Sequence, residues 1–182
     1  MHFFECYFNN VIKYDLFNKF YFKNINAITK LKKVVLNFSI NSSDFSSLIT
    51  FLATFELIGN QKGVFTRSKT SNIVFKIQKG DPVGCKIVLR KSNMYFFASK
   101  FTLYILPSFK KFDGLFFSKK SKNSITLKFK NSLLFSELLS QYEMFKSLPF
   151  LSITFVGTSS SINELVFLLR SYKLPLNKPI TF

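Results

Sequence analysis

Apolar residues recur every three or four positions in three stretches of the chain, residues 8–20, 44–58 and 92–106. This spacing is that of one helix face, so each stretch is predicted to be an amphipathic helix. Gly59 stands where the second helix should end, as the residue just past its last turn. Pro107 follows the third stretch and should end that helix.

Other stretches alternate between apolar and polar residues or are rich in β-branched residues, which predicts strands. The predicted strands are residues 32–40, 64–67, 72–79, 85–91, 125–129 and 150–156. The turn sequence GDPVG of residues 80–84 joins the third and fourth of these strands into a hairpin. Gly80 and Gly84 fit positions of such a hairpin that need a positive φ.

The order of these elements indicates an α+β fold. Ser161 and Glu164 have the spacing of a capping box, which predicts a last helix after the last strand. We expect a single domain over residues 1–182, with an N-terminal helical segment at 1–20 and a loose tail at 174–182. We expect a mostly antiparallel β-sheet with helices packed on one face, which leaves the other face available for binding.

The positive charge of the chain, +17 in all, is concentrated in its middle. Residues 60–130 hold 16 of the 26 basic residues and two of the nine acids, which is +14 for this segment and +3 for the rest. In residues 75–79 and 85–91, Lys alternates with apolar residues, which predicts a basic sheet face with Phe75, Ile77, Ile87 and Leu89 on the opposite face. A basic sheet face fits folded RNA, although for any single lysine a solvated surface position is the simpler interpretation.

The residues that usually carry catalysis or bind metals are scarce. The only histidine is His2, and the two cysteines, Cys6 and Cys85, are far apart in the sequence. This excludes a His-based triad and argues against a zinc site or a disulfide framework, so we interpret both cysteines as packed or free thiols. The acids are scattered, and no phosphate-binding glycine motif occurs. We therefore expect no enzyme, no metal, no cofactor and no small-molecule substrate.

No run of about 18–20 uncharged apolar residues occurs, so we expect no membrane insertion. A basic protein peripheral to an organelle membrane is the alternative to an RNA-binding protein. It would need an amphipathic helix with lysines along its polar face, and residues 92–106 contain only Lys100. A third class, a metal-dependent enzyme acting on nucleic acid, lacks candidate ligands.

Residues 56–115 resemble the large-subunit ribosomal protein family uL5 of bacteria and organelles. The residues that carry the resemblance are ELIGNQKGVFTRSKTSNIVFKIQKGDPVGCKIVLR, followed by ILPSFKKFDGL. The family pattern has a GQK-like turn, spaced basic residues, a GxPxGCK segment and a later PxxKxFxGL-like motif. The weaker resemblance outside this segment extends over most of residues 21–176.

The resemblance implies a structural, RNA-binding protein in the central protuberance of the large ribosomal subunit, with the uL5-like α+β fold. It implies contacts to rRNA (5S rRNA or an equivalent RNA, or large-subunit rRNA) and to neighbouring large-subunit proteins. The residues implied to bind RNA are Asn37, Gln61, Lys62, Thr66, Arg67, Lys69, Lys86 and Arg90. The loop implied to lie near P-site tRNA contains Lys69, Ser71 and Lys76, and the implied bridge to a small-subunit head protein contains Lys110, Lys111 and Asp113.

The amino-acid composition also indicates where the protein is made. Only three of the 26 basic residues are Arg, while Lys, Asn, Phe and Ile, which have A/T-rich codons, are abundant. This bias fits an A/T-rich organelle genome, and the first residues do not have the pattern of an import or secretory signal. We therefore expect an organelle-encoded protein in the large subunit of the ribosome of the mitochondrial matrix.

Overall fold

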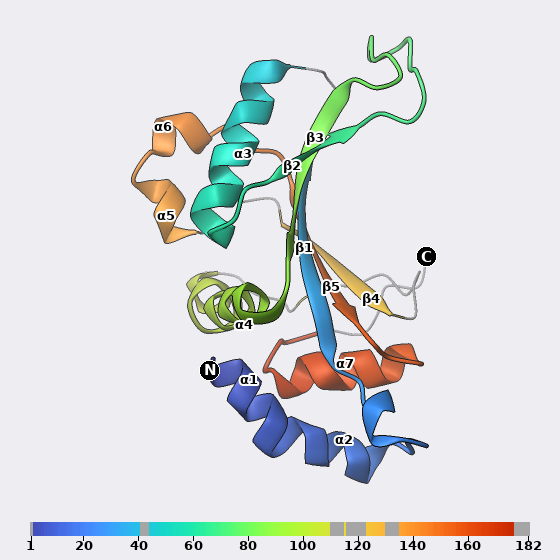
Figure 1. The fold of residues 1–182 in the computed structure, drawn as a ribbon. Helices are drawn as coiled ribbons and strands as arrows, with labels where there is room; N and C mark the ends of the chain where they lie inside the picture. The colour runs from blue at the N-terminus through green and yellow to red at the C-terminus, as the bar shows by residue number, and fades with distance from the viewer. Residues whose placement is uncertain (1, 41–43, 110–114, 116–122, 130–134, 177–182) are drawn as a thin grey trace. The chain divides into compact units, whose positions relative to one another are not determined.

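The computed structural model describes residues 2–40, 44–109, 115, 123–129 and 135–176. Within them, five strands form one antiparallel sheet in the order β2-β3-β1-β5-β4 (Figure 1). The strands are β1 (Leu31–Ser39), β2 (Val64–Arg67), β3 (Pro82–Leu89), β4 (Ser124–Phe129) and β5 (Leu151–Gly157). Together with the helices, this sheet confirms the predicted α+β fold.

Most helices of the described residues begin or end close to the predicted positions. The α-helices are α1 (Phe3–Tyr7), α2 (Lys13–Lys19), α3 (Phe45–Gly59), α4 (Lys91–Lys100), α5 (Ser136–Leu139), α6 (Tyr142–Phe145) and α7 (Ile162–Ser171). The π-helical turn η1 (Phe8–Ile12) joins α1 to α2, and a second one, η3 (Phe101–Ile105), extends α4. Short 3₁₀ turns are η2 (Ile25–Ala27) and η4 (Leu106–Ser108). None of the described helices is long and apolar enough to cross a bilayer.

The chain divides into two compact units. The first unit comprises residues 1–34, 90–127 and 154–182, and the second comprises residues 35–89 and 128–153. Strands β1, β4 and β5 therefore have residues in both units, whereas β2, β3 and α3 belong wholly to the second.

In the second unit, α3 packs its buried face, formed by Leu48, Phe51, Phe55 and Ile58, against β1 and β3. The Phe38 ring of β1 lies 4.9 Å from the ring of Phe55 and 5.2 Å from that of Phe51, both on α3. The left-handed residue that ends α3 is Asn60 (φ 49°), not Gly59 as predicted. Gly59 lies in close contact with β3, because a Cβ there would lie 2.8 Å from Ile87 Cδ1, the end of a side chain. Asn tolerates the left-handed conformation better than most residues, so it can take the terminal position.

In the first unit, the N-terminal helical stretch begins at Phe3, before the amphipathic pattern of residues 8–20 and within the expected helical segment 1–20. Its buried residues, Phe4, Phe8, Ile12 and Leu16, recur every four positions. Each of them is at most 9% exposed, so this face of the stretch is part of the core of the unit.

The predicted capping box at the start of α7 is present and reaches further than expected. Ser161 Oγ accepts from the backbone N–H of Glu164. The Glu164 carboxylate, 7% exposed, accepts from Thr29 Oγ1 at 2.7 Å and from the Ser160 hydroxyl at 2.7 Å. Burial alone would raise the pKa of Glu164, but the hydrogen bonds from Ser160, Thr29 and Ser161 outweigh it and lower that pKa.

We expect Glu164→Gln to lower the free energy of unfolding by about 1–3 kcal/mol at pH 7, because the two donors at one carboxylate oxygen lose their acceptor and the two at the other lose its charge. A lowered pKa in the folded state means that this stabilisation is present above the unfolded-state pKa and is lost as the pH falls through the folded-state value. The difference between Glu164→Gln and wild type should therefore shrink below about pH 4.5. Urea unfolding at several pH values measures it. Glu143→Gln, at an exposed position on α6, is the control and should change little.

Candidate nucleic-acid interface

Strands β2 and β3 pair antiparallel and create two different sheet faces. Lys86 lies opposite Val64, Cys85 opposite Phe65, and Gly84 opposite Thr66. Residues directly opposite each other project to the same face. Cys85 faces α3, where its thiol lies 3.6 Å from the Leu48 carbonyl oxygen, so Lys86 and Thr66 project away from α3.

We call this second side of the second unit the open face, formed by Asn37, Val64, Thr66, Lys86 and Val88. In Figure 1, α3, α5 and α6 all lie on the other side of these strands. The alternation along the strands agrees, since the neighbours of the open-face residues in β1 and β3 are the buried Leu36, Phe38, Cys85, Ile87 and Leu89. On this face Lys86 and Val64 are exposed, and Asn37 and Thr66 are half-buried.

Gln61 and Lys62 lie on the turn between α3 and β2, and both are exposed. The Gln61 amide donates to the Val88 carbonyl oxygen at 3.5 Å, which holds its side chain beside β3. Arg67, at the end of β2, is exposed as well. The second unit thus brings the predicted contact positions Asn37, Gln61, Lys62, Thr66, Arg67 and Lys86 onto its strands and the turn that flanks them.

Arg90 is not one of these positions. Strand β3 ends at Leu89, and the chain turns into α4 at Lys91, whose φ is 50°. Arg90 is the exposed N-cap of α4 and belongs to the first unit. The alternation that predicts Lys86 and Arg90 on one strand therefore extends one residue past the strand.

The predicted strand at residues 72–79 is wrong, and the predicted hairpin is replaced by a longer one. Strand β3 pairs with β2 instead, and residues 68–81 form the loop that joins them. Gly80 has a positive φ of 100°, as predicted. Gly84 does not have a positive φ and lies inside β3. Ile87 and Leu89 are buried as predicted, while Phe75 is 45% exposed in the loop.

Hydrogen bonds within the β2–β3 loop fix its conformation. At its base, the Ser68 N–H donates to the Asp81 carbonyl oxygen at 2.9 Å. Further out, Asn72 and Ile77 exchange two backbone hydrogen bonds, and the Asn72 side chain accepts from the Val74 N–H at 3.0 Å. The loop is thus arranged in advance of any contact, which reduces the entropy lost on binding.

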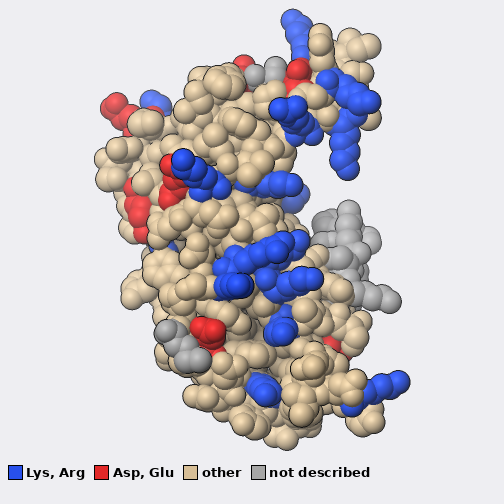
Figure 2. All heavy atoms as spheres, viewed as in Figure 1, with Lys and Arg blue, Asp and Glu red and all other residues tan. Residues whose placement is uncertain are grey.

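The tip of this loop combines exposed apolar side chains with positive charge. Ile73 is 93% and Val74 84% exposed. The exposed cations of the loop are Lys69, Lys76 and Lys79. Figure 2 shows basic side chains gathered where the loop projects, at the upper right. Ser71, the other predicted loop residue, is also exposed.

The thiol of Cys85 is a packed group of the strand. It is fully buried, and burial raises its pKa to about 11. Because the thiolate is the reactive form, this position should be inert near neutral pH.

We expect iodoacetamide at pH 8 to modify Cys6, which is half-buried, and to leave Cys85 unmodified in the folded chain. Peptide mass mapping identifies the labelled positions. The same treatment in guanidinium chloride is the control and should label both. Modification of Cys85 in the folded chain would contradict the packing described here.

Three predicted positions, Lys110, Lys111 and Asp113, lie outside the described residues. Among the residues that are described, no group of three or more His, Cys, Asp or Glu is arranged to hold a metal ion. The sequence reasoning missed the exposed apolar tip, because alternation predicted a strand there. The side-chain hydrogen bond of Asn72 and the positive φ of Lys76 (51°) are what break the strand.

Comparison with known proteins agrees with the geometry. Residues 82–176 match the C-terminal part of the ribosomal L5 family. The chain is 33% identical to the large ribosomal subunit protein uL5m of Reclinomonas americana, over 94% of this chain and 96% of that protein. It is 34% identical to uL5c of Oedogonium cardiacum, over 94% and 95% of the two chains. It is also 34% identical to uL5 of Clostridium beijerinckii, over 88% and 90%.

Proposed function

The chain belongs to the uL5 family, and on that premise we propose that its open face binds 5S rRNA, or an equivalent RNA, in the central protuberance. Membership makes it a structural, non-enzymatic constituent of the large ribosomal subunit, with rRNA and ribosomal proteins as partners. The proposal adds which surface meets which RNA.

The observation that carries the proposal is the composition of the open face. Lys86 and, at the strand end, Arg67 supply charge that can neutralise phosphates. Asn37 and Thr66 supply half-buried polar groups that can hydrogen-bond ribose hydroxyls and base edges. Gln61 and Lys62 extend the surface at its edge. We include Lys69 and Arg90 as phosphate contacts outside the strand pair.

We further propose that the β2–β3 loop lies near P-site tRNA, through Lys69, Ser71 and Lys76. Its internal hydrogen bonds and its exposed tip support this role, since a fixed, projecting, basic loop suits contact with a separate RNA. For Lys110, Lys111 and Asp113 we propose contact with a small-subunit head protein. That proposal rests on the sequence motif alone.

The similarity to a mitochondrial relative supports a mitochondrial ribosome. The matrix location and an organelle gene are proposals that rest on the amino-acid composition of the chain, which is rich in residues with A/T-rich codons.

Co-sedimentation tests the function directly. The chain should migrate with large subunits at moderate salt, and 5S rRNA or an equivalent RNA should crosslink to residues 61–86. Crosslinks restricted to residues outside β1, β2, β3 and their loops would overturn the assignment of the open face. Flotation with lipid after RNase treatment would instead support a peripheral membrane protein.

A further inference from the structure

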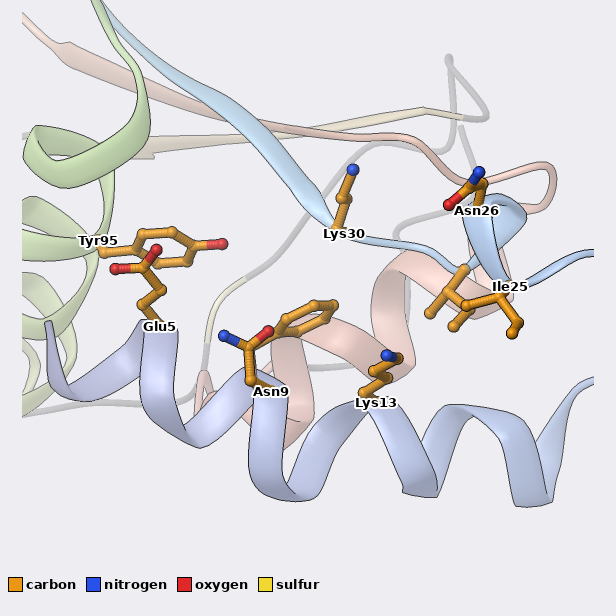
Figure 3. A pocket seen from close by; sticks show the side chains of 9 residues that line it. Glu5, Asn9, Lys13, Ile25, Asn26, Lys30 and Tyr95 are labelled. Atoms are coloured by element: carbon orange, nitrogen blue, oxygen red, sulfur yellow. The ribbon is translucent and has the colours of Figure 1, made fainter. Parts of the chain in front are cut away.

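A polar pocket of about 270 Å³ lies wholly within the first unit. The N-terminal helical stretch, the η2 turn, the residues leading into β1 and α4 line it (Figure 3). Glu5, Asn9 and Lys13 lie four residues apart along the helical stretch, so they project from the same side of it. Asn26, Lys30 and Tyr95 complete the polar lining.

The polar groups of this pocket are available to a ligand. No described residue is hydrogen-bonded or ion-paired to the side chains of Asn9, Lys13, Asn26 or Lys30. The lining residues include two lysines, Lys13 and Lys30, and one carboxylate, Glu5, so the pocket has a small positive excess. This arrangement fits an anionic ligand that also carries hydrogen-bonding groups.

The pocket is also partly apolar and locally irregular. Phe8 and Ile28, 9% and 5% exposed, contribute apolar lining that suits the flat face of a ring. Asn9 lies in the π-helical turn η1, a distortion that occurs frequently at functional sites. The pocket therefore combines an apolar surface, free amides and separated charges.

The separation of the charges suggests how a ligand would lie. Glu5 and Lys13 are two helical turns apart, about 12 Å along the axis. In Figure 3, Glu5 points toward Tyr95 at one end of the pocket, and Lys13 lies toward Asn26 at the other. Lys30 leaves the chain leading into β1 with its ammonium group directed away from the helical stretch. A phosphate would be held at Lys13, and a group with N–H donors would be held at the Glu5 carboxylate.

We propose that this pocket receives one unstacked guanosine nucleotide of an rRNA. Guanine presents two adjacent donors, N1–H and the 2-amino group, which match the two oxygens of the Glu5 carboxylate. The Asn9 amide, which lies beside Glu5 on the helical stretch, can donate to its acceptor O6. Lys13, at the other end of the pocket near Asn26, holds the phosphate. This inference rests on the proposed RNA binding and adds a second, base-selective contact outside the open face.

An NMR titration of the full chain with mononucleotides tests the pocket without any rRNA. The side-chain amide signals of Asn9 and Asn26 should shift with GMP. IMP, which lacks the 2-amino group, and UMP should bind about tenfold more weakly, as expected for loss of a bidentate pair. Glu5→Gln should lower the affinity for GMP to that for IMP.

The matched control is Asp15→Asn, which removes one negative charge from the same helical stretch at an exposed position outside the pocket. It should leave the preference for GMP unchanged. Equal affinity for GMP and IMP would overturn the proposal, as would identical shifts with inorganic phosphate or no shifts at all. If the chain migrates with large subunits but fails this test, only the proposed nucleotide pocket is rejected. If it passes this test but does not co-sediment, the proposed function is rejected.

Discussion

Gly84→Ala is expected to lower the free energy of unfolding by roughly 2–4 kcal/mol. A Cβ at this position would lie 2.4 Å from the Phe38 carbonyl oxygen and 3.2 Å from the Ser39 Cα, both backbone atoms of β1. Backbone atoms cannot move aside as the end of a side chain can, so β1 and β3 would have to separate. Urea unfolding measures the loss.

Gly63→Ala is the matched control for this substitution. A Cβ there would lie 3.0 Å from Leu52 Cδ2 and 3.2 Å from Phe55 Cδ2, which are side-chain and not backbone atoms. Both substitutions restrict the unfolded chain equally, which by itself stabilises by about 0.4–1 kcal/mol. The difference between the two variants therefore isolates the clash at Gly84. Equal unfolding energies would mean that β1 and β3 do not approach as closely as described.

Replacing Arg67 and Lys86 together with Ala is expected to weaken RNA binding about tenfold or more near 0.15 M salt. Both side chains are exposed on the β2–β3 pair. Each phosphate contact releases counterions, so the slope of log K against log salt should become less steep by about 0.9 for each lost contact. Filter binding of 5S rRNA or large-subunit rRNA at several salt concentrations gives both quantities.

The control removes the same charge from elsewhere. Lys23 and Lys146 are exposed and lie on neither β2 nor β3, so their double Ala variant should keep nearly the full slope. If both double variants lost the same slope, binding would depend on net charge alone. An unchanged slope in the Arg67 and Lys86 variant would remove the open face from the interface.

Strands of this fold were predictable where alternation coincides with a pairing partner. β1 and β2 agree closely with prediction, and in β1 the apolar residues at every second position are buried on one side. Residues 72–79 show the same alternation but have no strand to pair with, since β2 already occupies that edge of β3. Alternation describes only one strand, whereas pairing depends on the rest of the chain.

In the candidate interface, the sequence likewise predicts which face of a strand a residue occupies, but not where the strand ends. Lys86 could be placed on the face opposite Ile87 from the sequence, because neighbouring strand residues point to opposite faces. The sequence alone could not show that Arg90 lies beyond the strand that holds Lys86, because the end of β3 depends on the positive φ of Lys91. The pocket near Glu5 was not predictable, since its lining comes from four segments that only the fold brings together.

The division of the chain into two units has a consequence for making hybrid proteins with a relative. Exchanging one unit needs four crossover points, after residues 34, 89, 127 and 153. Three of them fall inside strands β1, β4 and β5. Each such junction would join half a strand from one parent to half a strand from the other. This could disrupt the hydrogen bonds between neighbouring strands. Grafts confined to the β2–β3 loop would keep every strand of a single parentage.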